Sequence, residues 1–493
     1  MIKTDNINFG NMFVVGFEGT ELNTDLAKQL KELDPAGIIF YDCNIESREQ
    51  VKKLIQDLKD LLGKNLIVSV DQEGGKVQRL RKISPNLPSL LSIGKLCSEQ
   101  EDASLIRQHT QLLAADLKDL GFNFVFAPCL DLNTSLENPI IGTRALHHDC
   151  KEVIPLIETI IQVFRDFGIG CCAKHFPGHG PTNKDSHHDL PHINLDQMNY
   201  MGHLSPFLEA IEECVPAIMT AHVLIDVEDI SDGSALCSTH PVSLSRDFII
   251  DDLRGSYGFQ GLVISDEITM KALSEYGNYQ ELSLDMIYAG NNLIIWNTNL
   301  GDALKTANYL NGMKNKYHNL QACYFASIGR IFEFYRYLVP PHSQLPELDL
   351  AMLQDNMLNA AADAIEFNTP VETLQEYFAS HEQELAQKNT AIVLLSHPKL
   401  EEAEFREVFG LDIYQVKDMK DFDEVFFSRY ETLLLINFQS HFTEAGQRLI
   451  KKFLNLDPNV VYICADQPSK DADINLLGAA KIHYQALKQV LFN

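Results

Sequence analysis

The residues whose types and spacing best suit chemistry lie together in the segment 174–188. Lys174 and His175 follow a short apolar run, and Asp185 and His187 come after a stretch with two glycines and two prolines. Glycine and proline disfavour helix and strand, so we expect a shaped loop here. A carboxylate two positions from an imidazole can accept its N–H, fix its tautomer and raise its basicity. The Asp185–His187 pair is therefore suited to moving a proton near neutral pH.

Two plainer interpretations of this segment stay open at this point. The loop could be a solvated, histidine-rich surface segment without a chemical role. It could also bind a metal ion through its imidazole nitrogens, the candidates being His175, His179, His187 and His188. The carboxylate ligands at fixed spacing that would complete such a site are missing, so we expect no metal ion and no other cofactor.

The composition indicates a large globular protein with an acidic surface. Its 493 residues are enough for two or more domains, and 45% of them are hydrophobic and 22% charged. The chain has 40 basic and 68 acidic residues, a formal net charge of -28. Because binding to a phosphate backbone depends on Lys and Arg, we expect no nucleic-acid partner.

The cysteines and the apolar runs indicate a cytoplasmic protein. Ten cysteines are scattered without a C-x-x-C pair, and Cys171 and Cys172 are adjacent in an apolar run, where a strand would point them to opposite faces. We expect reduced cysteines in a reducing compartment. No apolar run is long enough to span a membrane, and no basic segment followed by an apolar one opens the chain.

Eight short apolar runs alternate with helical patterns over the first two thirds of the chain. The expected strands are 12–16, 37–40, 66–70, 122–127, 170–173, 217–219, 261–265 and 292–296. Between them, residues such as Val51, Leu54, Ile55 and Leu58 repeat at helical spacing. This alternation predicts a (β/α)8 TIM barrel. The alternative is an open doubly wound sheet. No glycine-rich phosphate motif follows the first run, which argues against a dinucleotide site in such a sheet.

Polar residues follow six of these eight runs, where a barrel has its active site. They are Asp71, Asp131, Lys174 with His175, His222, Asp266 with Glu267, and Asn297, and Arg144 lies in the loop after Asp131. One polar residue at a strand end is often only a helix cap, but six are harder to explain that way. His222 could equally be a packed core histidine, and we expect Trp296 in the barrel core.

The last third of the chain has a different pattern. We expect a catalytic barrel domain over 1–337, a linker and helix over 338–370, and an α/β sandwich domain over 371–493. The helix is predicted for 352–369, and apolar runs at 391–395, 432–436 and 460–464 predict strands. This part shows no cluster of catalytic residue types.

The residue types at the strand ends suit glycoside hydrolysis. Asp266 can attack an anomeric carbon or act as a base, and His187 can deliver a proton to a leaving group. Asp71, Arg144, Lys174 and His175 are groups that hold hydroxyls. A retaining glycosidase needs both a nucleophile and an acid/base, and here a His–Asp pair stands where a second carboxyl is usual.

Three segments resemble bacterial β-N-acetylglucosaminidases of glycoside hydrolase family 3. They are Asp71–Arg79, Lys174–Gly180 with Asp185–His187, and Ser265–Met270, and the resemblance spans residues 10 to 335. The long histidine-containing element is the most specific, because the family's β-glucosidases lack it and take an acid from their second domain. Two departures are Glu267, where the family usually has Asp, and Thr143, where an acidic residue is common.

The resemblance implies a role for each matching position. Asp266 corresponds to the nucleophile, His187 to the acid/base and Asp185 to its partner. The positions that bind N-acetylglucosamine correspond to Asp71, Arg79, Arg144, Lys174 and His175. The implied reaction removes terminal N-acetylglucosamine from muropeptides in the cytoplasm during peptidoglycan recycling. A weaker likeness extends to the second domain of two-domain members.

Two other functions remain open from the sequence. An imidazole acid/base would not repel phosphate as a carboxylate would, so the covalent intermediate could be released as a sugar phosphate by a phosphorylase. A non-catalytic sugar-binding or scaffold protein is the second alternative. Loss of Asp266 or His187 would favour it, and both residues are present.

Overall fold

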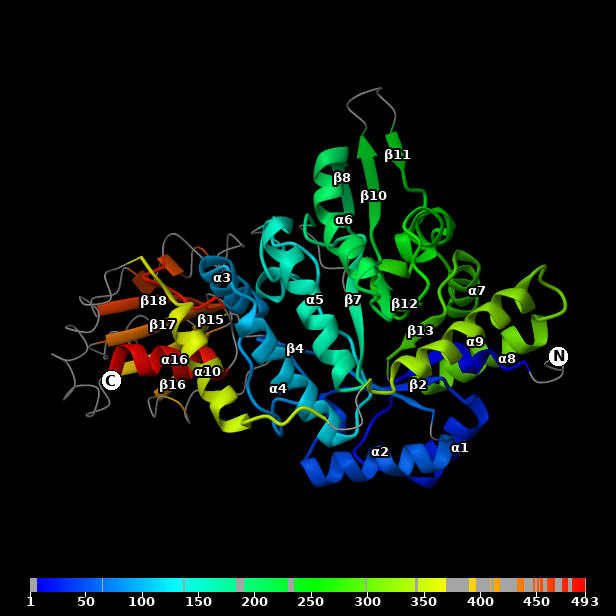
Figure 1. Cartoon of the computed structure of the whole chain (residues 1–493), viewed down its shortest axis with the longest axis horizontal. Helices are drawn as coiled ribbons and strands as arrows, with labels where there is room; N and C mark the ends of the chain where they lie inside the picture. The colour runs from blue at the N-terminus through cyan, green and yellow to red at the C-terminus, as the bar shows by residue number, and fades with distance from the viewer. Residues whose placement is uncertain are drawn as a thin grey trace.

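The structure, a computed structural model, describes most of the chain up to residue 368 and parts of the remainder. The described ranges are 7–63, 65–135, 138–182, 190–228, 235–297, 299–341, 345–368, 390–395, 408, 412–416, 432–438, 447, 450–451, 453–454, 459–465, 472–477 and 481–492. Figure 1 shows the barrel and the C-terminal sheet side by side along the long axis of the molecule.

Eight parallel strands close into a barrel, which confirms the (β/α)8 prediction over the open sheet. The strands are β1 (Phe13–Val15), β2 (Gly37–Phe40), β3 (Ile67–Val70), β6 (Phe124–Val125), β7 (Gly170–Phe176), β9 (Ala217–Thr220), β12 (Leu262–Glu267) and β13 (Leu293–Trp296). Each pairs in parallel with its neighbours, and β1 pairs with β13, for example Val14 with Ile295, which closes the ring. Closure brings all eight carboxyl-terminal strand ends to one rim.

Helices that follow the strands surround the barrel. They are α1 (Thr24–Leu33), α2 (Arg48–Leu62), α3 (Leu90–Gln100), α4 (Ser104–Leu120), α5 (Cys150–Asp166), α6 (Gln197–Glu212), a π-helix (Asp247–Ser256), α7 (Tyr279–Ala289), α8 (Leu300–Met313) and α9 (Leu320–Tyr337). In α2 the four periodic residues, from Val51 to Leu58, are buried, and the Ser47 side chain caps the first turn.

The barrel strands divide their side chains between two apolar clusters. Cys171 packs in the outer cluster and Cys172 in the inner one, so the two adjacent cysteines do face opposite sides. Phe334 of α9 joins the inner cluster and contacts the ring of Phe124. Trp296 is fully buried beside Phe13, which confirms that it belongs to the core.

Two small sheets extend from the barrel at its rim. An antiparallel hairpin, here called the 72–78 hairpin, consists of β4 (Gln72–Gly74) and β5 (Val77–Gln78). The second sheet consists of β8 (His192–Asp196), β10 (Leu224–Glu228) and β11 (Ala235–Cys237). In Figure 1 the second sheet projects away from the barrel.

A six-stranded sheet forms the C-terminal α/β part, as the apolar runs predict. Its order is β14 (Glu366–Phe367), β19 (Ile474–Asn475), β18 (Asn459–Ala465), β17 (Thr432–Phe438), β15 (Thr390–Leu395) and β16 (Asp412–Val416). Helix α10 (Leu350–Asp363) packs on α16 (Lys481–Phe492) and on α4 of the barrel. The helix predicted for 352–369 was too long, because Glu366 and Phe367 pair with β19 instead.

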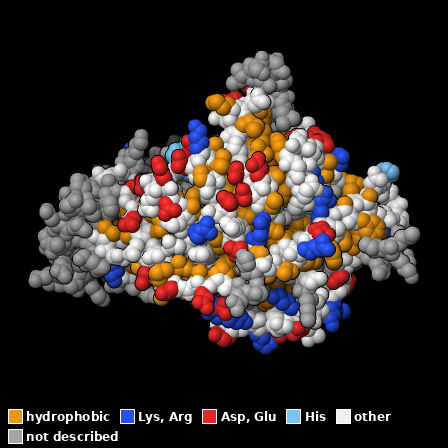
Figure 2. All heavy atoms as spheres, in the orientation of Figure 1, with side chains coloured by type: hydrophobic (Ala, Val, Ile, Leu, Met, Phe, Trp, Pro, Cys, Tyr) orange, Lys and Arg blue, Asp and Glu red, His pale blue; other side chains and the backbone are white. Residues whose placement is uncertain are grey.

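The surface carries both signs of charge. Figure 2 shows Asp and Glu side chains interspersed with Lys and Arg over the face in view. Among the described residues, no helix is both long and apolar enough to cross a membrane.

Candidate active site

The predicted site residues that the structure describes lie at one rim of the barrel. Asp71 follows β3, and Arg144 ends a short 3-10 turn after β6. Lys174 and His175 lie within β7, and Asp266 lies within β12.

The fifth strand is longer than its apolar run suggested. The expectation that it ends at residue 173 was wrong, because β7 continues to Phe176, which pairs with Thr220 of β9. The backbone of Lys174 also forms an isolated parallel β-bridge with that of Cys129. The strand backbone therefore fixes Lys174 and His175 more firmly than a loop would. Asp185 and His187 lie outside the described residues.

Four charged residues form a buried ion cluster, here called the Glu73 cluster. Glu73 accepts hydrogen bonds from Nε and Nη2 of Arg144, both at 2.9 Å, and lies 2.7 Å from Nζ of Lys174. Lys174 also donates to Asp71 at 2.9 Å. Fork-like pairing of guanidinium and carboxylate fixes the geometry as well as the charge. The Asp71 and Lys174 side chains are therefore held in fixed positions at the rim.

The charges of the Glu73 cluster compensate its burial. Burial alone would raise the pKa of Glu73, but Arg144 and Lys174 outweigh it and lower the pKa to about 2. Burial would likewise lower the pKa of Lys174, and Asp71 and Glu73 raise it instead. Both groups are consequently charged at neutral pH.

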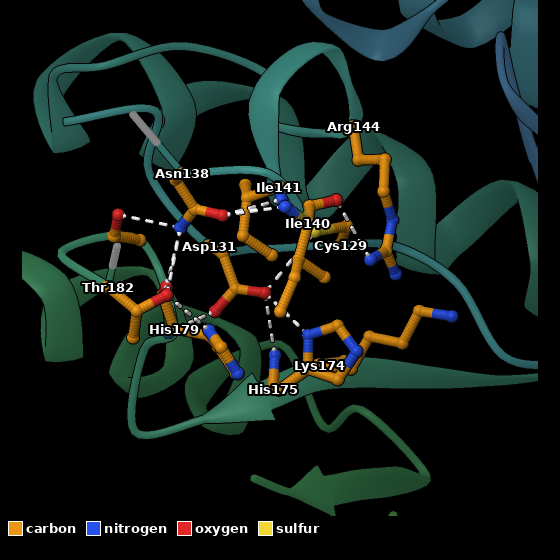
Figure 3. A network of polar contacts seen from close by, with 12 residues as sticks. Cys129, Asp131, Asn138, Ile140, Ile141, Arg144, Lys174, His175, His179 and Thr182 are labelled. Atoms are coloured by element: carbon orange, nitrogen blue, oxygen red, sulfur yellow. Dashed lines mark hydrogen bonds and ion pairs between the residues drawn. The ribbon is translucent and has the colours of Figure 1, made fainter. Parts of the chain in front are cut away.

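Asp131 organises a second group of polar contacts (Figure 3). One carboxylate oxygen interacts with Nδ1 of His175 at 2.6 Å and accepts the His175 backbone N–H at 3.1 Å, and the other accepts the His179 N–H at 2.6 Å. Burial alone would raise the pKa of Asp131, but the two histidines hold it well below the usual range. A charged Asp131 that binds Nδ1 leaves Nε2 of His175 as the ring nitrogen for a ligand.

The start of the histidine-containing loop is fixed by Asn138. Its side-chain amide donates to the carbonyls of His179 and Gly180, both at 2.9 Å, and its oxygen accepts the N–H groups of Ile140 and Ile141. Burial lowers the pKa of His179 to about 4, so this histidine is neutral near pH 7. The segment that leads to Asp185 therefore begins from a rigid point.

Three side-chain atoms of the kinds that bind metal ions lie close together within the Asp131 group. Atoms of Cys129, Asp131 and His175 all lie within 4.8 Å of one another. The Asp131 carboxylate already interacts with four donors, one of them the Cys129 thiol at 3.3 Å. Burial raises the pKa of Cys129 well above its usual value, so the thiol is protonated and can donate to Asp131. This geometry suits a hydrogen-bonded cluster better than a metal site.

Glu267 ties together the ends of β12 and β13 beside Asp266. Its Oε1 accepts the backbone N–H and the hydroxyl of Thr269 and the N–H of Asn297 at 3.2 Å. Burial raises the pKa of Glu267. Asp266 accepts the Glu267 N–H at 2.8 Å. The glutamate thus reaches the next strand, and it supports the backbone that carries Asp266.

Two site residues, Glu73 and Tyr41, were not singled out from sequence, and Asp131 was named only as a polar residue after the fourth strand. The partners of Glu73 and Asp131 are distant in the chain and could not be read from spacing. Tyr41 follows β2, as the polar candidates follow other strands, and Arg79 stacks over its ring at 5.9 Å from the centroid. Burial, and then the charges of nearby carboxylates including Asp71, raise the pKa of Tyr41 well above its usual value.

His222 takes the core role that was one of its two interpretations. It is fully buried, and its ring nitrogens contact the Ser243 hydroxyl at 2.7 Å and the Glu267 carbonyl at 3.0 Å. It thereby supports the strand end next to Asp266.

Comparison with protein families identifies the barrel. Residues 6–319 match the glycosyl hydrolase family 3 N terminal domain. The chain is 32% identical over 284 residues to a beta-hexosaminidase of Haemophilus influenzae, covering 57% of this chain and 78% of that protein. It is 30% identical to the beta-hexosaminidase of Bordetella avium, with 57% and 79% covered.

Solved structures share the fold. A glycoside hydrolase family 3 beta-N-acetylglucosaminidase from Paenibacillus sp. superposes with a TM-score of 0.80 at 23% identity, covering 98% of this chain and 95% of the other. NagZ from Neisseria gonorrhoeae, in complex with N-trifluoroacetyl-D-glucosamine, has a TM-score of 0.58 at 24% identity, covering 71% and 97%. With the family model matching well over half of its length, this chain belongs to glycosyl hydrolase family 3 and is a glycoside hydrolase.

Proposed function

We propose that this protein is a retaining β-N-acetylglucosaminidase. The observation that carries the proposal is that Asp266 shares one barrel rim with the Glu73 cluster and with His175. The rim thus combines a carboxylate with a fixed set of groups that bind hydroxyls. The curated relatives named beta-hexosaminidases support the substrate class.

In this proposal the reaction proceeds in two displacements. Asp266 attacks the anomeric carbon while His187, oriented by Asp185, protonates the leaving oxygen. The glycosyl–aspartate ester is then hydrolysed by water, with His187 acting as base. Asp71, Lys174, His175, Arg144 and Arg79 hold the sugar, and they act on its hydroxyl and acetamido groups through charge-assisted hydrogen bonds.

We place the reaction in peptidoglycan recycling in the cytoplasm, with muropeptides as the substrates. Nine described cysteines, among them the exposed Cys43 and Cys214, are free thiols. Free thiols are typical of a reducing compartment.

The experiment that tests the function compares two aryl glycosides. The protein should hydrolyse a nitrophenyl N-acetyl-β-glucosaminide and leave the matching β-glucoside almost untouched. The same assay in phosphate buffer should release N-acetylglucosamine and not its 1-phosphate. Release of the 1-phosphate would mean a phosphorylase, and no turnover of either glycoside would favour a sugar-binding protein.

A further inference from the structure

The C-terminal part of the chain makes buried hydrogen bonds to the barrel at the N-terminus of α3. The backbone N–H of Ser89 donates to Nε2 of His483, on α16, at 3.2 Å. The hydroxyls of Ser89 and Ser92 both donate to the carbonyl of Leu477, the latter at 3.1 Å. His483, Ser89 and Ser92 are each at most 1% exposed.

These contacts specify the state of the imidazole. A backbone N–H can only donate, so Nε2 of His483 must be the unprotonated acceptor, with the ring proton on Nδ1. Leu477 presents its carbonyl from a left-handed backbone conformation, with φ of 51°, which is unfavourable for a non-glycine residue. The surrounding contacts must outweigh that cost, so the junction is a well-defined structure and not a chance contact.

The segment just before Ser89 packs directly against the 72–78 hairpin. The N–H of Gly75 donates to the carbonyl of Leu87 at 3.0 Å, and the Gln78 side chain bonds both the N–H and the carbonyl of Leu87. A Cβ at Gly74 would lie 2.5 Å from the Pro88 carbonyl oxygen, and one at Gly75 would lie 2.8 Å from Cβ of Ser89. The hairpin and residues 87–89 are thus hydrogen-bonded and packed too closely for a side chain at Gly74 or Gly75.

The hairpin carries the central residue of the ion cluster. Glu73 lies in β4, next to Gly74, and it bonds Arg144 and Lys174 of the rim. A continuous series of contacts therefore leads from His483 through Ser89 and the hairpin to the Glu73 cluster. In Figure 1, β4 lies between the barrel strands and the C-terminal sheet.

We propose that His483 is a positioning residue for the sugar-binding rim, and that the C-terminal domain acts as a brace that holds the 72–78 hairpin in place. This proposal rests on the proposed function for its kinetic readout. It gives the C-terminal domain a role in the reaction without any residue of that domain touching the substrate. Loss of the Nε2 acceptor leaves the buried Ser89 N–H unpaired, and residues 87–89 can then move together with the hairpin.

The test compares two substitutions of one residue with a control at the same interface. His483→Gln places an amide oxygen near the position of Nε2 and can still accept the Ser89 N–H, whereas His483→Leu cannot. Asn356→Ala removes a different contact between the two parts, the 2.7 Å bond from Asn356 on α10 to Gln108 on α4. KM and kcat are measured on the nitrophenyl N-acetyl-β-glucosaminide, and hydrogen exchange is measured for the peptide 71–79.

We expect His483→Leu to raise KM about tenfold with kcat per folded molecule changed by no more than about twofold, because misplaced binding groups weaken substrate binding. Exchange in 71–79 should be faster in this variant. His483→Gln and Asn356→Ala should match the wild type in both measurements. If His483→Leu is unfolded at the assay temperature, His483→Asn, whose acceptor is too short to reach Ser89, replaces it under the same criteria.

Two results would overturn the proposal that His483 holds the 72–78 hairpin in place. One is a folded His483→Leu protein with wild-type KM and wild-type exchange in 71–79. The other is an equal rise in KM for Asn356→Ala. It would mean that packing of the C-terminal part on the barrel in general, and not the His483 contact, determines the position of the rim residues. If the wild-type protein fails to turn over the glycoside, the proposed function is wrong, and the exchange comparison alone still decides whether His483 braces the hairpin.

Discussion

Glu73 is not among the residues expected to bind the sugar, yet it contacts both buried cations of the rim. Without it, Arg144 and Lys174 would lie close together and buried, with only the more distant charge of Asp131 near Arg144 and the Asp71 ion pair on Lys174. An unpaired buried charge is far more costly than the ion pair is favourable. Glu73 therefore permits Arg144 and Lys174 to be buried close to each other.

At the residue scale, we predict that Glu73→Gln lowers the free energy of unfolding by about 3 kcal/mol at pH 7. The folded pKa, about 2, lies below the ordinary value of 4.5. The stabilisation is therefore present above pH 4.5 and is lost as the pH falls toward 2. Chemical denaturation of both proteins at several pH values should show their difference shrinking by roughly half between pH 5 and pH 3.

The matched control for this prediction is Asp57→Asn, which removes an exposed ion pair with Lys53. That change should alter the free energy of unfolding by less than about 1 kcal/mol at any of these pH values. A difference between wild type and Glu73→Gln that stays constant with pH would contradict the assigned charge state of Glu73.

At the scale of elements, Asp185 and His187 lie outside the described residues, and the pair is the subject of a prediction from sequence alone. His187→Ala should reduce hydrolysis of a muropeptide far more than that of a nitrophenyl glycoside, because only the poor leaving group needs the proton. Asp185→Ala should show the same pattern more weakly, since the imidazole remains but is less well oriented. Equal losses on both substrates would assign His187 to sugar binding alone.

A second prediction at this scale concerns glycine substitutions in the 72–78 hairpin. Gly74 and Gly19 both have positive φ, 107° and 98°, but only at Gly74 would a Cβ meet backbone atoms; at Gly19 nothing lies within 4 Å. Gly19→Ala should thus cost about 1 kcal/mol of stability and leave KM unchanged. Gly74→Ala should cost more and raise KM, because the hairpin must shift.

Thermal unfolding and steady-state kinetics on the two glycine variants separate backbone strain from displacement of the hairpin. If Gly74→Ala had the same KM as Gly19→Ala, the position of the hairpin would not matter for sugar binding.

The barrel strands could be predicted from sequence because each is a short, continuous apolar run, and burial on both faces requires such a run. The strand ends could not be placed as well. Lys174 is fully buried in β7, and its polarity suggested a loop because the partner that neutralises it, Glu73, is 101 positions earlier in the chain. The end of α10 was missed for the same reason, since β14 depends on pairing with β19.

At the scale of the whole molecule, the positions of Asp71 and Asp266 at strand ends could be predicted, because each carboxylate directly follows an apolar run. The site was not predictable where two distant segments must meet. Ser89 and His483 are separated by 394 positions, and the sequence around neither residue indicates that the two are in contact. The C-terminal domain, which showed no catalytic residue types, could be given a role only through this contact.

We propose that Asp266 acts as the nucleophile of a retaining β-N-acetylglucosaminidase. The most direct measurement is proton NMR of the first-formed sugar during hydrolysis of a nitrophenyl N-acetyl-β-glucosaminide. Two displacements at the anomeric carbon predict β-N-acetylglucosamine as the initial product, followed by slow mutarotation, and an Asp266→Asn protein that is folded but slower by several orders of magnitude. Initial formation of the α anomer would contradict the claim and remove the nucleophile role from Asp266.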